Sequence, residues 1–194
     1  MTTVDSLPGL LAGLGIPPRG VVHVGAHTGQ EVPLYRAAGF ARIVLVEPNP
    51  YLAAQLRGMD GVEVVEAACA SAAGTRTLHI TERDKLSSLY RPLTRPVVAA
   101  VGVRAYRLAD LIDDTVNVAV IDVQGAELEV VSGAPLDTLD VVVVETHSRS
   151  KYAGAPGYAE AVTSMGRLGW RVAAEWPHDP KGKCRDVAFV KVSR

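Results

Sequence analysis

Four short apolar runs, alternating with helix-like segments, constrain the fold of this chain more than any other feature. The runs are Gly20–Gly25, Arg42–Glu47, Asn117–Asp122 and Asp140–Glu145. Continuous apolar runs of this kind are typical of strands that are buried on both faces of a sheet. Strands that alternate with helices are joined by crossover connections, so they run parallel to one another. The sequence therefore predicts a doubly wound α/β fold.

Shorter signals indicate the elements between these runs. A helical pattern from about Thr28 to Ala38 stops at Gly39, a residue type that favours the turn after a helix. A second, short helix is expected to begin at Asn49–Pro50, with a cap followed by a proline in the first turn. Val62–Ala68 is predicted to be a third strand.

The last third of the chain changes character. Gly169–Trp176 and Asp186–Val192 are strand-like, and the turn-rich segment Pro177–Lys183 lies between them. Two strands joined by such a turn favour antiparallel pairing. We therefore expect the parallel sheet to end in an antiparallel edge.

The stretch from Thr75 to Arg107 does not follow the alternation. It contains the strand-like Arg76–Thr81 and then the polar segment Glu82–Arg91. A long excursion inside a compact domain is usually functional or mobile. We interpret residues 81–105 as an irregular cap over the substrate side of a single domain that comprises residues 1–194.

Composition argues against several classes of partner. The 194 residues suffice for one domain with a real core, and the net charge of −1 comes without any block of like charges. Nucleic-acid binding normally needs a basic stripe that neutralises phosphates, so we expect no nucleic-acid partner. The chain shows neither a signal-peptide pattern nor an apolar stretch of the ~20 residues that span a bilayer. We expect no membrane partner and a cytoplasmic location.

The two cysteines, Cys69 and Cys184, each stand alone in a hydrophobic, strand-like setting. A small secreted domain would usually carry more cysteines at regular spacing. We interpret both as buried free thiols that act as small hydrophobic side chains, rather than as a disulfide or a metal site.

A glycine-containing turn, Gly25-Ala-His-Thr-Gly29, follows the first strand and opens a helix. Such a turn lets a ligand approach the backbone closely and points helix N–H groups at a carboxylate or phosphate. Glu47 ends the second strand, where an acid can accept hydrogen bonds from both ribose hydroxyls of a nucleotide. The simpler alternative is that the glycines only shape the turn and that Glu47 is a solvated strand end.

Three features favour S-adenosylmethionine (SAM) over NAD as the nucleotide ligand. The turn lacks the Gly-x-Gly-x-x-Gly spacing that is expected for a pyrophosphate. The chain contains no Tyr-x-x-x-Lys pair, which the short-chain dehydrogenases use for hydride chemistry. The sheet is also expected to end in an antiparallel hairpin, as the sheets of SAM methyltransferases do.

Several segments, spread from Val21 almost to the C-terminus, carry a family resemblance. They are His23–Glu31, Val46–Pro50, Ser87–Leu89, Ile121–Leu128, Val144–Glu145 and Arg185–Val190, of which the Asp-Val-Gln-Gly-Ala-Glu-Leu block is the most specific. On these residues the chain resembles the FkbM family of SAM-dependent methyltransferases, although many relatives have Asp where this chain has His23. The resemblance implies a mostly parallel seven-stranded sheet of the class I (Rossmann-like) type, SAM as cofactor, and usually O-methylation of a sugar or secondary metabolite.

The turn, the acid and the resemblance together predict how SAM is held. The methionine part is expected on the turn, the ribose on the acid after the second strand, and the adenine on the residues after the third strand. The predicted cofactor-binding residues are Gly25, Ala26, His27, Gly29, Glu47, Pro48, Glu66, Ala67, Ala68 and Asp122.

Asp122, Glu145 and His147 are the candidate catalytic residues, because they arrive from adjacent strand ends. Methyl transfer to an alcohol requires removal of the hydroxyl proton, which favours a nearby carboxylate or imidazole. Enzymes that methylate exocyclic amines often have two prolines after the corresponding acid, and this chain has Val123-Gln124 instead. The three candidates would also suit a divalent cation, so metal binding is a further possibility.

Each of these residues also has a structural alternative. Asp122 would cap the helix that starts near Gly125. Glu127, in the first turn of that helix, would stabilise it through the helix dipole. His147 would be an ordinary loop residue.

The predicted acceptor-binding residues are Ser87, Ser88, Gln124 and Tyr152. A serine in a loop usually satisfies only backbone groups, so the prediction for Ser88 depends on the family resemblance. The cap is locally basic, which favours an acceptor with a phosphate or carboxylate, through Arg83, Lys85, Arg91 and Arg95. Two functions other than methylation of a small hydroxylated acceptor stay open. They are a non-catalytic SAM- or nucleotide-binding module that serves a partner enzyme, and a nucleic-acid methyltransferase.

Overall fold

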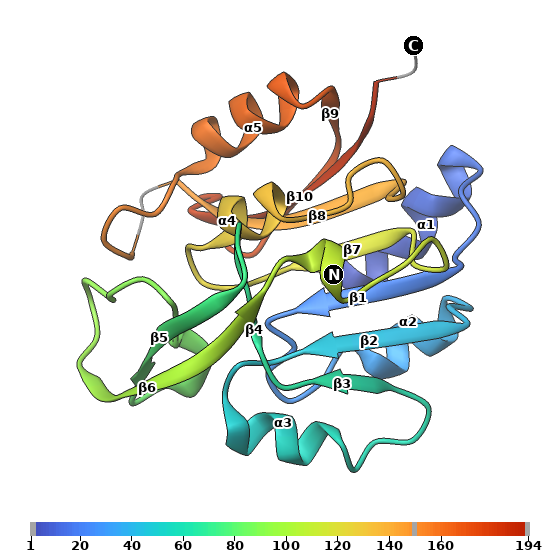
Figure 1. Cartoon of the computed structure of the whole chain (residues 1–194). Coiled ribbons are helices and arrows are strands. Elements are labelled where there is room, and N and C mark those ends of the chain that lie inside the picture. The colour runs from blue at the N-terminus through green and yellow to red at the C-terminus, as the bar shows by residue number, and fades with distance from the viewer. Residues whose placement is uncertain (1–2, 149–150, 193–194) are drawn as a thin grey trace.

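A seven-stranded sheet forms the centre of the computed structural model, which describes residues 3–148 and 151–192 (Figure 1). In sheet order, its strands are β3 (Glu63–Val65), β2 (Arg42–Val46), β1 (Gly20–Val24), β7 (Val118–Ile121), β8 (Val141–His147), β10 (Cys184–Lys191) and β9 (Trp170–Pro177). Neighbours from β3 to β8 are parallel, whereas β10 is antiparallel to both β8 and β9. The predicted doubly wound sheet with an antiparallel C-terminal edge is confirmed.

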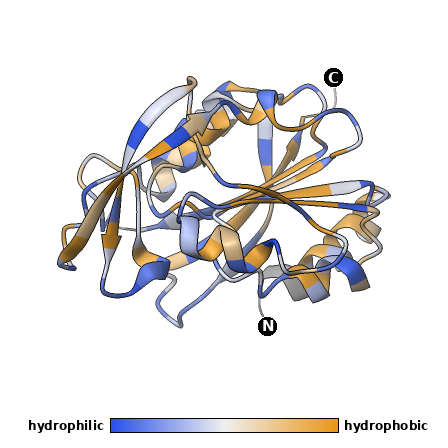
Figure 2. Cartoon of the chain, turned by 60° about the horizontal axis from the view of Figure 1, so that its bottom comes forward, coloured by the Kyte–Doolittle hydropathy of each residue, from blue (hydrophilic) through white to orange (hydrophobic). Residues whose placement is uncertain are grey.

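Apolar side chains on both faces of the sheet explain why its strands are continuous apolar runs. On β1, Val22 and Val24 pack with α4 (Glu127–Ser132) and α5 (Tyr158–Arg167). Val21 points to the opposite face and packs with α1 (Thr3–Leu14) and α2 (Val32–Ala37), although the sequence patterns did not predict α1. Figure 2 shows these apolar strands between the helices. Full burial of one such side chain stabilises the fold by about 1.5–3 kcal/mol.

The helix predicted from Thr28 begins only at Val32. His27 and Gly29 have positive φ angles of 49° and 69°, which an α-helix cannot contain, so the turn stays outside the helix. The prediction of its start was therefore wrong. Its predicted stop is confirmed, because Gly39 has a φ of 87°, in the left-handed region.

The short helix after β2 forms as the sequence predicts. α3 (Pro50–Leu56) begins with proline, and the Asn49 side chain accepts a hydrogen bond from the backbone N–H of Tyr51 at 3.1 Å. None of the helices in the described part of the chain combines the length and the apolar character that a membrane crossing needs.

The region predicted to be an irregular cap is largely a regular hairpin. β5 (Gly74–Thr81) pairs antiparallel with β6 (Val97–Tyr106), and β6 pairs with the short β4 (Ala68–Cys69) in a second sheet. The interpretation of residues 81–105 as irregular is thus wrong for 97–105, where the sequence shows no alternation because most of that part of β6 is exposed on both faces. Only residues 82–96, with the single 3-10 turn η1 (Asp84–Leu86), keep an irregular path. The predicted strand Val62–Ala68 is also wrong as one element, since it divides into β3 and the start of β4.

The hairpin lies beyond the carboxyl ends of β1, β2 and β7 (Figure 1). β1 and β7 are neighbours in the sheet, and the chain winds away from them in opposite directions, which makes a crevice at their ends. A Cβ atom at Gly25 would lie 1.9 Å from the carbonyl oxygen of Asp122. Only glycine therefore permits the approach of the two strand ends on which the candidate site is built.

Candidate active site

A small pocket lies between these strand ends and the loop around η1. Residues that line it include seven predicted for the cofactor and three predicted for the acceptor: Gly25, His27, Glu47, Pro48, Ala67, Ala68 and Asp122, and Ser87, Ser88 and Gln124. The cavity has a volume of about 50 Å³, room for only a few water molecules. The structure thus gathers most of the predicted residues around one pocket, which the loop lines on one side.

Glu47 is a buried wall of this pocket and not a solvated strand end. Its side chain accepts hydrogen bonds from the backbone N–H groups of His27 at 2.9 Å and Asn49 at 2.8 Å. Burial raises the pKa of the Glu47 carboxyl, and the two backbone hydrogen bonds oppose that shift. The carboxylate therefore fixes the glycine turn, while its place in the lining fits a role toward a ribose.

The loop around η1 contacts the glycine turn directly. His27 Nε2 lies 3.2 Å from Asp84 Oδ1, which lowers the pKa of the Asp84 carboxyl. Both residues line the pocket, so this contact closes it on the side of the turn.

Three predicted cofactor residues lie outside this lining. Ala26 lines the neighbouring cleft, and Gly29 packs against the side chains of Leu56 and Met59. The Glu66 carboxylate is exposed and pairs with Arg57 at 2.8 Å. Among the three residues predicted for adenine, only Ala67 and Ala68 face the pocket.

A larger cleft of about 770 Å³ adjoins the pocket. Its size falls within the usual range of small-molecule sites, roughly 300–1,000 Å³. Asp122 and Gln124 line both the pocket and the cleft, as do Gly25, His27 and Lys85. The end of β7 therefore stands at the junction of the two spaces.

Gln124 links the two candidate carboxylates at this junction. Its Nε2 donates to Asp122 Oδ1 at 2.6 Å and to Glu145 Oε2 at 2.8 Å, and its Oε1 accepts from the Tyr152 hydroxyl at 2.7 Å. Burial, and then the negative charge of Asp122, raise the pKa of the Glu145 carboxyl well above its usual range. The two carboxylates are thus held by one amide, and Glu145 resists ionisation.

Two of the predicted acceptor residues hold the loop in place. The Ser88 hydroxyl donates to the carbonyl oxygen of Gln124 at 2.7 Å and accepts from the backbone N–H of Tyr90 at 3.0 Å. Tyr152 is buried, and its hydroxyl is engaged by Gln124. Ser87 lines the pocket but does not line the larger cleft.

The structural alternative for Asp122 is wrong, because the residue that caps α4 is Ala126. Glu127 does lie in the first turn of α4, as its structural alternative states. In addition, Glu127 Oε1 accepts from the backbone N–H of Gly125 at 2.8 Å and that of Val123 at 3.3 Å. Burial raises the pKa of the Glu127 carboxyl to about 7. Glu127 fixes the loop that presents Asp122, because it is long enough to reach back to these N–H groups.

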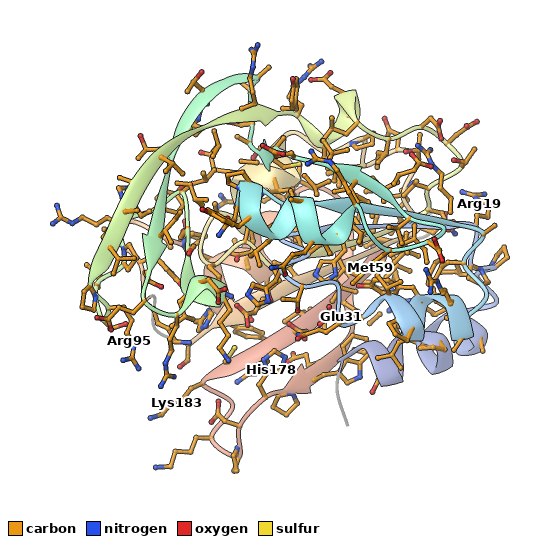
Figure 3. All side chains as sticks on the ribbon, turned by 90° about the horizontal axis from the view of Figure 1, so that it is seen from below. Arg19, Glu31, Met59, Arg95, His178 and Lys183 are labelled. Atoms are coloured by element: carbon orange, nitrogen blue, oxygen red, sulfur yellow. The ribbon has the colours of Figure 1, made fainter. Side chains whose placement is uncertain are left out.

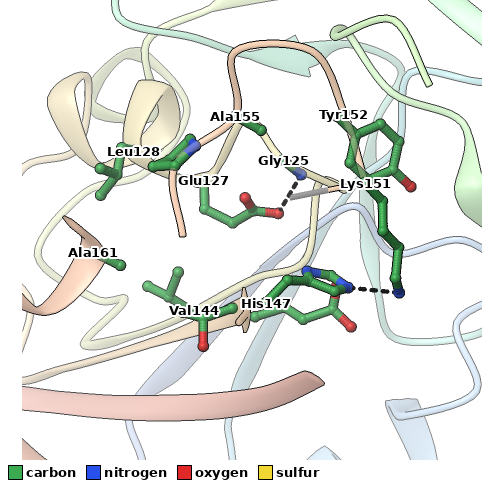
Figure 4. A pocket seen from close by; sticks show the side chains of 12 residues that line it. Gly125, Glu127, Leu128, Val144, His147, Lys151, Tyr152, Ala155 and Ala161 are labelled. Atoms are coloured by element: carbon green, nitrogen blue, oxygen red, sulfur yellow. Dashed lines mark hydrogen bonds and ion pairs between the residues drawn. The ribbon is translucent and has the colours of Figure 1, made fainter. Parts of the chain in front are cut away.

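His147 is turned toward Lys151 rather than into either space (Figure 4). Its Nε2 lies 2.8 Å from Lys151 Nζ. His147 lines neither the pocket nor the cleft but a third, smaller pocket, which Gly125 and Tyr152 also line. Burial, and then the Lys151 charge, lower the pKa of His147 to about 4. The ring is therefore neutral at pH 7. Its loop alternative is wrong, since it is the buried last residue of β8.

Potential metal ligands gather differently from the predicted set. Asp122 and Glu145 lie together with Glu127, their ligand oxygens within 4.8 Å of one another, whereas His147 groups with Glu145 and Cys184. Cys69 is buried among apolar side chains as predicted, but Cys184 is half-buried and contacts Glu145 and His178. The apolar setting predicted for Cys184 is thus wrong. No sequence signal indicated Lys151, His178 or Asp186, which also line the cleft.

Several solved structures with the same architecture are methyltransferases. They include methyltransferase FkbM from Methylobacillus flagellatus KT (TM-score 0.62, 13% identity, 89% of this chain and 44% of that one). Another is magnesium protoporphyrin IX methyltransferase from Synechocystis PCC 6803 with bound SAM (TM-score 0.57, 13% identity, covering 98% of this chain and 78% of that one). A third is an rRNA methylase from Streptococcus thermophilus (TM-score 0.57, 11% identity, covering 100% of this chain and 98% of that one). The chain therefore has the class I methyltransferase fold, and it spans less than half of the FkbM structure.

The family assignment comes from the sequence itself. Residues 23–172 match the family model of the methyltransferase FkbM domain. The chain belongs to this family of methyltransferases, in agreement with the resemblance carried by the block that begins at Asp122. The comparison with curated proteins gives no significant match.

Proposed function

We propose that this protein is a SAM-dependent O-methyltransferase that acts on a hydroxyl of a small molecule. One observation carries the proposal. Asp122 lies at the junction of two spaces: a pocket whose polar and apolar lining fits a nucleoside, and a cleft large enough for an acceptor. Membership of the FkbM methyltransferase family supports the same chemistry.

The residues present fit SAM in their chemistry. Glu47 provides a carboxylate for the two ribose hydroxyls, and Ala67 and Ala68 provide an apolar wall for adenine. When bound, SAM supplies an electrophilic methyl group. Asp84 and Lys85 of the loop line this cavity of about 50 Å³, and we expect the loop to shift outward when SAM enters.

Asp122 is the proton acceptor in this proposal. It reaches both spaces, whereas Glu145 lines only the cleft and His147 lines neither. Gln124 positions the Asp122 carboxylate through the 2.6 Å hydrogen bond and also donates to the Glu145 carboxyl, so it lies between the two acids. A general base of this kind contributes roughly 10²–10⁴-fold to the rate, and the rest comes from alignment of the acceptor oxygen.

The acceptor we propose is a single sugar or a metabolite of similar size with an anionic group. Lys85 and Lys151 line the cleft and would face a phosphate or carboxylate. The other basic residues of the cap, Arg83, Arg91 and Arg95, are exposed and do not line it. The cation predicted for Asp122, Glu145 and His147 has no role here, because His147 is turned toward Lys151.

Two measurements test the proposal. Isothermal titration should show binding of SAM and none of NAD, and NAD binding without a response to SAM would overturn the cofactor assignment. A transfer screen with labelled SAM should then compare free sugars, nucleotide sugars, hydroxylated polyketides and RNA. Methylation of RNA alone would favour a nucleic-acid methyltransferase. SAM binding without turnover on any acceptor would favour a non-catalytic module.

A further inference from the structure

A cluster of metal-ligand side chains lies beside the candidate site and has no part in the proposed methyl transfer. Cys184 Sγ lies 3.2 Å from Glu145 Oε1 and 3.3 Å from His178 Nδ1, and these last two atoms are 3.7 Å apart. In a tetrahedral zinc site, bond lengths of ~2.0–2.3 Å place neighbouring ligand atoms about 3.3–3.6 Å apart. The three mutual distances thus lie within 0.1 Å of the range for zinc ligands.

The antiparallel register brings these residues to one face of the sheet. Glu145 on β8 is opposite Asp186 on β10, and His147 is opposite Cys184. Directly opposed residues point to the same face of a sheet, and so do residues two positions apart. His178 joins them from the end of β9, where its backbone N–H donates to the carbonyl oxygen of Cys184 at 2.9 Å.

A rigid turn holds His178 and Cys184 together. The Asp179 carboxylate accepts hydrogen bonds from the backbone N–H groups of Lys181, Lys183 and Cys184 at 2.8–3.1 Å. The turn between β9 and β10 is thus fixed from within. A preorganised pair of ligands lowers the entropy that a metal would cost on binding.

The imidazole of His178 is oriented as in protein metal sites. Its Nε2 lies 2.7 Å from Asp186 Oδ2, and a carboxylate there accepts a hydrogen bond from the ring Nε2–H. The neutral ring then has its free lone pair on Nδ1, the atom that faces Cys184 and Glu145. Carboxylates that fix a ligating histidine in this way are the usual outer partners of zinc.

We propose that Cys184 Sγ, His178 Nδ1 and Glu145 Oε1 form a binding site for one Zn²⁺-class cation, with Asp186 as the positioning residue of His178. Thiolate, imidazole and carboxylate are the donors that such a borderline-soft cation prefers. His147 is outside the set because Lys151 occupies its Nε2. Glu145 and His178 also line the cleft of about 770 Å³, whose lining includes Glu31, labelled together with His178 in Figure 3. A fourth ligand of the cation would therefore come from that cleft.

Three residues of this cluster are also arranged in space like a nucleophile, a base and an orienting acid, namely Cys184, His178 and Asp186. The surroundings of the thiol disfavour that use. The thiol donates its hydrogen bond to Glu145 Oε1 at 3.2 Å, so its proton is directed to Glu145 rather than to the His178 ring. A bound cation would take the place of the thiol proton, which is released to solvent.

Metal binding to the reduced, full chain tests the site without SAM or an acceptor, so its outcome is separate from that of the proposed function. Titration with Co²⁺ should give a thiolate-to-metal charge-transfer band in the near ultraviolet, and Zn²⁺ should displace it with a stoichiometry of one per chain. Cys69→Ala is the matched control, because Cys69 is buried in the core without a histidine partner. It should keep the band, whereas Cys184→Ser should lose it. Asp186→Asn should weaken Zn²⁺ binding about 10–100-fold.

Two results would overturn the proposal. One is the absence of a thiolate band in the folded wild-type protein, or its loss in Cys69→Ala rather than in Cys184→Ser. The other is an equal rate of Cys184 modification by a thiol reagent with and without Zn²⁺, since a coordinated thiolate is protected. The wild-type band and the modification rates are read on protein that retains Cys184, so these two readouts do not depend on the folding of a variant. His79→Gln, in the β5–β6 hairpin, serves as the histidine control for His178→Gln.

Discussion

Replacement of Asp122 by Asn separates proton removal from cofactor binding. Asn keeps the size of the side chain and an oxygen that can still accept the Gln124 amide, which Asp122 binds at 2.6 Å. It removes only the basic carboxylate from the junction of pocket and cleft. A general base contributes roughly 10²–10⁴-fold, so we expect kcat to fall by that factor, or about 2.7–5.5 kcal/mol in the activation barrier.

The assay is single-turnover transfer from labelled SAM, combined with calorimetric titration of SAM. The dissociation constant of SAM should change by less than about threefold, because the Asn side chain still lines the pocket without filling it. Asp114→Asn is the matched control, since Asp114 is an exposed acid just before β7 and should leave both quantities unchanged. Wild-type turnover in Asp122→Asn would refute the assignment of the base and leave Asp122 with a positioning role only.

Three further predictions address the turn, the loop and the buried histidine. Gly25→Ala should abolish SAM binding and lower the Tm far more than Gly154→Ala. Both glycines have a positive φ, but of the two only a Cβ atom at Gly25 would meet backbone, at 1.9 Å. Equal losses of Tm in the two variants would refute the close approach. Asp84→Ala should speed SAM association in stopped-flow fluorescence, because it removes the contact with His27, and an unchanged rate would show that this contact does not close the pocket. The folded pKa of His147 is about 4, below the usual 6.5, so stability should fall as the pH drops from about 6.5 to about 4. Lys151→Met should raise that pKa in an NMR titration, and no rise would contradict the charge contact.

The strand ends could be predicted from the sequence because their signal is local. Gly25, Glu47 and Asp122 each follow an apolar run, and a parallel sheet brings the ends of such runs to one edge. β6 escaped prediction because it pairs across a long loop, and several of its apolar residues are exposed, so neither alternation nor a short turn marks it. Propensity does not report pairing of this kind, which depends on distant partners.

The cleft-side residues depend on register and could not be inferred from spacing. His178 lies in the turn-rich segment Pro177–Lys183, and Cys184 begins the strand after it. The sequence patterns predicted a turn and a strand there but no contact with Glu145. Their meeting with Glu145 requires the alignment of β10 on β8, in which Asp186 is opposite Glu145. A shift of one residue would turn Cys184 to the other face of the sheet. The polar cluster is thus a product of tertiary pairing.

Gln124 connects the two chemistries of this site. Its φ of 59° lies in the left-handed region, a conformation that costs a non-glycine residue roughly 1–3 kcal/mol and persists only where surrounding contacts hold it. Those contacts are the Ser88 hydroxyl on its carbonyl oxygen and the Tyr152 hydroxyl on its side chain. The strained residue then spans Asp122, at the methyl-transfer junction, and Glu145, whose other oxygen faces Cys184 and His178. Because the same Gln124 amide binds both acids, a cation on that other oxygen would alter the hydrogen bond that positions Asp122, so that metal binding and proton removal would be coupled through this one amide.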